Sequence, residues 1–256
     1  MIAIAPALGG AVLGAAGASA AEAVRCDTPT EVTRLANPLP RVAHKLETGE
    51  PIRIVAIGSS STAGAGASAP VKAYPAQLQA ELAQRFPRQA FVVMNRGVNG
   101  EEAKDMLRRF KLAVLDEHPD LVLWQLGTNS VLRDHPMSDH GALIRDGINR
   151  IKLAGADVVL IDPQFAPKVI AKRDVNQMVE LIGLTAKIEN VDLFRRFALM
   201  RNWHEVQHIP FEAFVSPDEL HMNDWSYACL AKGLADAIAE AATRPVSSAS
   251  AVTLIP

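Results

Sequence analysis

Three residues that together could perform acyl transfer stand where loops are expected in this chain. Ser60 lies in a run of small residues that follows an apolar segment, and Asp218 and His221 precede the last expected helix. Acyl transfer needs a nucleophile, a base that takes its proton and a group that orients the base. We therefore expect Ser60 to be the nucleophile, His221 the base, and Asp218 the carboxylate that orients and stabilises the imidazole.

The same chemistry requires hydrogen-bond donors for the negative charge that develops on the substrate oxygen. The expected oxyanion hole consists of the backbone N–H groups of Ser60 and Gly100 and the side-chain amide of Asn129. Ser59 and Ser61 flank Ser60, so either of them could be the nucleophile instead. The glycine-x-serine spacing favours Ser60.

Short apolar segments that alternate with helical patterns must position these residues. Residues 52–57 are almost continuously apolar and predict a buried strand that ends just before Ser60. Fully apolar strands that alternate with helices predict a parallel sheet covered on both faces. The other expected strands are 91–95, 121–126, 157–161 and 191–194, and the expected helices are 74–86, 101–114, 139–153, 174–189 and 225–241.

The order of these motifs resembles the SGNH hydrolases, also called the GDSL esterase/lipase superfamily. That family has a GDS-type nucleophile motif, a glycine after the second strand, a GxND motif and a DxxH motif, and the resemblance covers roughly residues 52–240. Asp218 matches the triad acid. The resemblance implies an α/β fold: a three-layer α/β/α sandwich with a flavodoxin-like parallel sheet of about five strands. It also implies an enzyme that needs neither metal nor organic cofactor. The four name-giving positions are occupied, in chain order, by Ser60, Gly100, Asn129 and His221.

Two positions depart from the family pattern. The aspartate that precedes the family's nucleophile is Ser59 here, and the aspartate that follows the oxyanion asparagine is Ser130. Neither position has a catalytic role in the family pattern, so we expect activity to survive. The departures indicate a divergent branch, for which the substrates of relatives are a poor guide.

The residues and the resemblance together predict a serine esterase that hydrolyses carboxylic esters through an acyl-enzyme on Ser60. The expected substrate is a small-molecule or glycan ester with a short acyl or O-acetyl group, and a lysolipid fits equally well. Acyl transfer with the same residues is a further option. An alternative from another class is a non-catalytic glycan-binding module on the same fold, against which the intact set of Ser60, Asp218 and His221 argues.

A zinc metalloprotease is a less favoured alternative. His204, Glu205 and His208 spell the HExxH motif, in which two histidines on one helical face bind zinc and the glutamate acts as base. Pro210 cuts this segment short, so we expect the motif to be polar residues on a helix or loop. Arg195, Arg196 and Arg201 could line a substrate cleft, but we expect them on an exposed helix face.

The composition gives no indication of a nucleic-acid partner, and the N-terminal residues suggest an exported protein. The 256 residues carry a net charge of -2, without the basic excess that a nucleic-acid partner would require. Residues 1–23 resemble a signal peptide, which predicts a periplasmic or secreted protein. They are too weakly hydrophobic for a span, so no stable membrane insertion is expected. The expected organisation is a signal peptide at 1–23, an N-terminal extension at 24–50, an SGNH hydrolase domain at 51–243 and a flexible tail at 244–256.

The two cysteines are too few for a disulfide framework or a cysteine-rich zinc site. In an oxidising compartment Cys26 and Cys229 could pair and tie the N-terminal extension to the last helix. We expect instead two unrelated thiols, with Cys229 as a small core residue.

Overall fold

A parallel five-stranded sheet forms the centre of the computed structural model, which describes residues 25–245. The strand order is β2-β1-β3-β4-β5, and every neighbouring pair is parallel. This is the order of a flavodoxin-like sheet, so the expected fold is confirmed. The predicted signal peptide at 1–23 and most of the predicted tail lie outside the described residues. The strands are β1 (Ile52–Gly58), β2 (Phe91–Gly97), β3 (Leu121–Gln125), β4 (Asp157–Ile161) and β5 (Asp192–Phe194).

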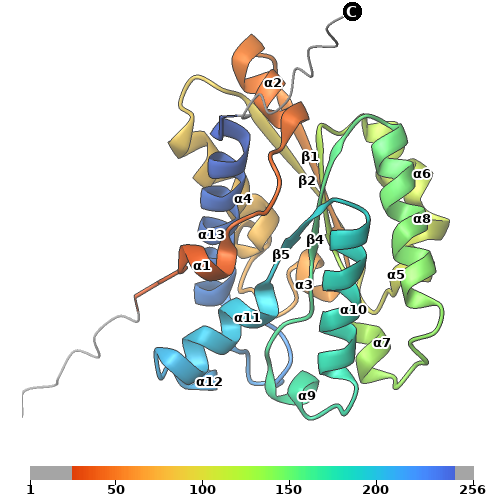
Figure 1. Ribbon diagram of the computed structural model, residues 1–256. Coiled ribbons are helices and arrows are strands. Elements are labelled where there is room, and N and C mark those ends of the chain that lie inside the picture. The colour runs from red at the N-terminus through yellow and green to blue at the C-terminus, as the bar shows by residue number, and fades with distance from the viewer. Residues whose placement is uncertain (1–24, 246–256) are drawn as a thin grey trace, which may run out of the picture.

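Helices cover both faces of the sheet and make the expected three layers (Figure 1). One face carries α4 (Tyr74–Arg85) and α13 (Asp224–Thr243), which pack against each other. The other carries α8 (His140–Leu153) and α10 (Val175–Ile188). These helices bury one apolar stripe each, as amphipathic helices on a sheet must. The shorter helices are α1 (Thr30–Thr33), α2 (Pro40–Thr48), α3 (Ser60–Ala63), α5 (Ala103–Arg108), α6 (Phe110–Ala113), α7 (Thr128–Leu132), α9 (Pro167–Ile170), α11 (Arg196–Arg201) and α12 (Phe211–Phe214).

The helix expected at 101–114 begins later than predicted and is divided into α5 and α6. Glu102 caps the amino end of α5, since its carboxylate accepts from the backbone of Asp105, whose own side chain binds the Glu102 N–H. Glu101 lies before the helix and binds Arg109, the residue between α5 and α6. The predicted start of this helix at residue 101 is therefore wrong, because the capping box places Glu102 just before the first helical residue.

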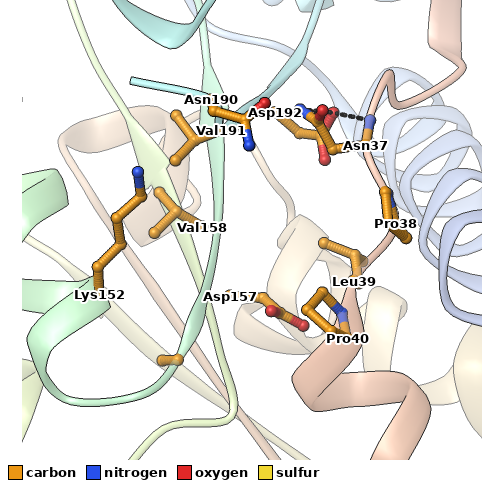
Figure 2. Close-up of a pocket in the computed structure, with 11 residues that line it drawn as sticks. Asn37, Pro38, Leu39, Pro40, Lys152, Asp157, Val158, Asn190, Val191 and Asp192 are labelled. Atoms are coloured by element: carbon orange, nitrogen blue, oxygen red, sulfur yellow. Dashed lines mark hydrogen bonds between the residues drawn. The ribbon is translucent and has the colours of Figure 1, made fainter. Parts of the chain in front are cut away.

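The N-terminal segment at 35–42 packs across the amino ends of the strands. Asp192 Oδ1 accepts from the backbone N–H of Asn37 at 3.0 Å, and Asp157 Oδ2 accepts from that of Val42 at 3.0 Å. Burial raises the pKa of Asp157 to about 6. Figure 2 shows residues that line a hollow between this segment and the strands. The hollow has a volume of about 280 Å³. It lies at the sheet edge away from the carboxyl ends of the strands, so it belongs to the packing of the N-terminal segment.

Cys26 and Cys229 form a disulfide that ties the residues before α1 to α13. The expectation of two unrelated thiols is therefore wrong, although Cys229 is a buried core residue as predicted. The fold brings the two Cα atoms to 5.4 Å, within the range for a disulfide. A sequence separation of 203 residues conceals this proximity.

Substitution Cys26→Ser is expected to lower the free energy of unfolding by about 2–5 kcal/mol, because the bond closes a long loop in the unfolded chain. Cys26 is the residue to change, since serine at the fully buried position 229 would place a hydroxyl in the core. Urea unfolding of the wild type and the variant measures the difference in their free energy of unfolding. Wild-type protein under reductant should match the variant, and reductant should not affect the variant. Equal stability of wild type and variant would contradict a stabilising role.

Candidate active site

Ser60, His221 and Asp218 form a hydrogen-bonded chain at the carboxyl edge of the sheet. Ser60 is the first residue of α3, which Ser59 alone separates from the end of β1. Its Oγ lies 2.8 Å from Nε2 of His221, and Nδ1 of that histidine lies 2.5 Å from Oδ2 of Asp218. The structure thus brings together the three side chains that the sequence suggested, in the order that proton transfer requires.

The two neighbouring serines face other partners. Ser59 is 2% exposed, and both its backbone N–H and its hydroxyl donate to Oε1 of Gln125 at 2.9 Å. Ser61 is equally buried and directs its hydroxyl towards Gln164. Within this run only Ser60 bonds to His221. The geometry therefore favours the register with Ser60 as nucleophile.

The loop that carries Asp218 and His221, the expected triad acid and base, is held by its own hydrogen bonds. Asp218 Oδ1 accepts from the backbone N–H groups of Leu220 and His221 at 3.0 and 2.9 Å. Burial alone would raise the pKa of Asp218, but the bonds from His221 and Leu220 outweigh it and hold that pKa below its usual value. The carboxylate is therefore ionised near neutral pH and able to orient the imidazole.

The expected oxyanion donors lie on neighbouring segments. Gly100 has a φ of +77°, a left-handed conformation that favours glycine. Asn129 is the second residue of α7, and its Nδ2 donates to the carbonyl of Glu101 at 2.8 Å. Since an amide nitrogen carries two hydrogens, this bond orients the side chain and uses only one of them. Ser60, as the first residue of its helix, has an N–H without an intrahelical acceptor.

Substitution Asn129→Ala is expected to lower kcat by about 10²–10³ if this amide stabilises the developing oxyanion. The change in KM should be small, because the donor acts mainly in the transition state. Steady-state kinetics on p-nitrophenyl acetate measure both constants. Asn176→Ala, at an exposed position of α10, is the matched control and should leave them unchanged. A rise in KM with unchanged kcat would place Asn129 in substrate binding instead.

Two buried polar residues that support the site were missed from the sequence. Gln125 at the end of β3 binds Ser59, as described above. Glu102 is 6% exposed and accepts from Ser130 at 3.2 Å and from Arg133 at 2.5 Å. Ser130, at the second position that departs from the family, thus holds the segment beside the expected oxyanion donors. One feature of the sequence could have revealed Gln125, which is a lone polar residue at the end of an otherwise apolar strand.

The charge of Glu102 is stabilised by its partners. Burial alone would raise its pKa, but hydrogen bonds from His135 and Arg133 outweigh this and lower the pKa of Glu102 to about 2. His135 Nδ1 lies 2.9 Å from the carboxylate. The segment between Gly100 and α7 is therefore tied by an ionised carboxylate throughout the neutral range.

The HExxH residues do not form a metal site. His204 lies in a π-helical turn at Asn202–Val206, its Nδ1 is 3.0 Å from the carbonyl of Ile209, and its ring stacks on Phe211. His208 lies beyond that turn with a φ of 55°. Between residues 25 and 245, no group of three or more His, Cys, Asp or Glu side chains is arranged to hold a metal ion. The zinc alternative therefore has no support from the geometry.

The arginines near the fifth strand do not share one exposed face. Arg196 is completely buried, so the prediction is wrong for this residue. Its Nε donates to the carbonyl of Asp162 at 2.9 Å and its Nη2 to Oε1 of Gln164 at 3.0 Å. These bonds compensate in part for the cost of burying a guanidinium. The pattern of one helix by itself does not reveal that such partners exist.

The fold and the order of the site residues are those of the SGNH hydrolase class, as the motifs predicted. The chain belongs to the Non-GDSL lipase-like family, whose model matches residues 25–244. That description agrees with the serine at position 59, where the GDS-type motif has aspartate. Comparison with curated proteins gives no match.

Solved structures share the fold at low sequence identity. A two-domain esterase (CEX) active on acetylated mannans has a TM-score of 0.71 at 22% identity over 86% of this chain, which spans only 58% of that protein. Axe2, an acetyl xylan esterase from Geobacillus stearothermophilus, has a TM-score of 0.63 at 20% identity over 73% of this chain and 94% of its own. TesA has a TM-score of 0.62 at 20% identity over 74% of this chain and 99% of its own. At these identities the similarity shows the fold.

Proposed function

We propose that this protein is a carboxylic ester hydrolase of the serine type. The observation that carries the proposal is the chain of hydrogen bonds from Ser60 through His221 to Asp218, with atoms 2.8 and 2.5 Å apart. This arrangement activates a serine hydroxyl as nucleophile. Family membership supports the same chemistry.

In the proposed reaction, Ser60 Oγ attacks the ester carbonyl and its proton passes to His221 Nε2. The tetrahedral oxyanion accepts hydrogen bonds from the Ser60 and Gly100 N–H groups and the Asn129 amide. Protonated His221 then gives its proton to the alcohol oxygen, the ester bond breaks, and an acyl-enzyme remains. His221 deprotonates a water that attacks this acyl group, and the acid leaves as Ser60 recovers its proton. Asp218 stabilises the imidazolium in both halves.

The proposed substrates are small esters, with O-acetyl groups on carbohydrates as the first class to test. The support is the fold shared with esterases described as acting on acetylated mannans and acetyl xylan. The Cys26–Cys229 disulfide supports export to an oxidising compartment. In the described part of the chain, no helix has the length and apolar character needed to cross a membrane.

The experiment that tests the proposal compares the purified protein with Ser60→Ala on p-nitrophenyl acetate, butyrate and octanoate, and on acetylated xylan and mannan oligosaccharides. An aryl fluorophosphonate should label wild-type protein at Ser60, as located by peptide mapping. Preference for octanoate would contradict the acetyl assignment. Absence of both hydrolysis and labelling would contradict the esterase itself and favour a binding module.

A further inference from the structure

A single buried amide connects the segments that carry the nucleophile, the oxyanion amide and the base. Gln164 follows β4 and is 1% exposed. Its Oε1 accepts from Thr128 Oγ1 at 2.8 Å and lies 3.5 Å from Ser61 Oγ, while its Nε2 donates to the carbonyl of Leu220 at 3.2 Å. The three contacted residues are the chain neighbours of Asn129, Ser60 and His221, respectively.

We propose that Gln164 is a positioning residue that sets the catalytic segments relative to one another; this inference rests on the esterase function proposed above. The three contacted residues lie in α3, in α7 and in the loop before α13, which are far apart in the chain. Each segment also has hydrogen bonds of its own, as where Asp218 Oδ1 accepts from the backbone N–H groups of Leu220 and His221, but Gln164 contacts all three segments at once. Its side chain therefore determines the distance between Ser60 and His221 across the carboxyl edge of the sheet.

The orientation of this amide follows from the chemistry of its partners. The guanidinium of Arg196 has only donors, and its Nη2 lies 3.0 Å from Gln164 Oε1. The carbonyl of Leu220 can only accept, so the amide nitrogen must face it. Arg196 is itself held by the carbonyl of Asp162. Because the bond from a buried cation is charge-assisted, it anchors the oxygen side of the amide firmly.

Only a side chain with an acceptor on one side and a donor on the other satisfies this site. Glutamate has the same size and keeps acceptors for Thr128 and Arg196. It has no donor when ionised and places an oxygen against the Leu220 carbonyl. Gln164→Glu therefore cuts the link to the loop of His221 and leaves the links to the other two segments in place. The added negative charge faces the buried Arg196, which favours a folded variant.

We expect Gln164→Glu to lower kcat for p-nitrophenyl acetate by about 10–100-fold, because small displacements of catalytic groups cost that much in rate. KM should change by less than about threefold, since no group that touches substrate is altered. The loss should be larger for ethyl acetate, whose poor leaving group depends more on proton donation from His221. A merely structural role would lower the active fraction equally for both esters and would not produce this difference.

Two further variants keep the test decisive. Gln177→Glu makes the same change at an exposed position of α10 and should behave as wild type. Thr128→Val removes one donor to Gln164 without adding charge, and should lower kcat by about 3–10-fold by the same displacement argument. It decides the question if Gln164→Glu does not fold.

If a folded Gln164→Glu variant has the kcat and the leaving-group dependence of the wild type, the positioning role is wrong. If Gln164→Glu does not fold, the same result in Thr128→Val overturns the positioning role. Ser60→Ala is measured alongside, which separates the two proposals. If Ser60→Ala is inactive and the Gln164 and Thr128 variants are normal, only the positioning role is wrong. If Ser60→Ala remains active, the proposed function itself is wrong.

Discussion

Substitution Ser60→Ala is expected to lower kcat by about 10⁶, as loss of the nucleophile does in serine hydrolases. In the proposed reaction Ser60 Oγ forms the bond to the acyl group, and the alanine side chain offers no atom that can replace it. The oxyanion donors remain, so a small residual rate above that in water should persist. Hydrolysis of p-nitrophenyl acetate, followed under saturating substrate, measures the loss.

The fold of the Ser60→Ala variant should be unchanged, since Ser60 is only half-buried and its hydroxyl bonds to His221 alone among the described side chains. Ser138→Ala removes a hydroxyl from an exposed loop and is the matched control, with wild-type activity expected. Unchanged activity in Ser60→Ala would exclude this residue as nucleophile. Ser59 and Ser61 would then be the next residues to substitute.

Substitution Asp218→Asn is expected to lower kcat near neutral pH by about 10⁴. The asparagine oxygen can still accept from the backbone of Leu220 and His221, so the loop should keep its shape. An amide has no charge to stabilise the imidazolium, and it allows the tautomer in which His221 Nε2 carries the proton and cannot act as base. Steady-state kinetics across the pH range measure the loss.

The neighbouring substitution Glu219→Gln removes one negative charge from the same loop at an exposed side chain. It should leave kcat unchanged, which separates the specific role of Asp218 from a general electrostatic effect. An equal loss in both variants would contradict the assignment of Asp218 as the orienting carboxylate. A loss confined to KM would place this carboxylate in substrate binding.

Local sequence patterns were sufficient for the sheet and its class. Each strand is a short apolar run bounded by turn residues, and each strand pair is separated by an amphipathic segment long enough for a crossover helix. Residues 157–161 were predicted as a strand with the bounds that β4 has, and the other strands differ by one or two residues at their ends. These patterns are reliable because burial on both faces of a sheet imposes them on consecutive residues.

Local sequence patterns were also sufficient to suggest the residues of the candidate site. Ser60, Gly100 and Asn129 were proposed as site residues because each follows a strand, and parallel strands place their carboxyl ends at one edge. Asp218 and His221 lie close together in the sequence, within a single loop. Parallel topology therefore brings Ser60, Gly100 and Asn129 to one edge of the sheet, and the tertiary structure places the loop of Asp218 and His221 beside Ser60.

Only the tertiary structure decided which side chains support that site. Gln164, Arg196 and Glu102 are polar residues whose burial depends on partners far away in the sequence, and no local period distinguishes them from exposed ones. The Cys26–Cys229 bond was rejected for the same reason. The sequence by itself determined the sheet and its crossover helices, since these follow from hydrophobic periodicity along the chain, and the order of the candidate motifs can be read from it directly. The pairing of buried polar groups follows from how the elements pack in three dimensions, and only the folded structure shows it.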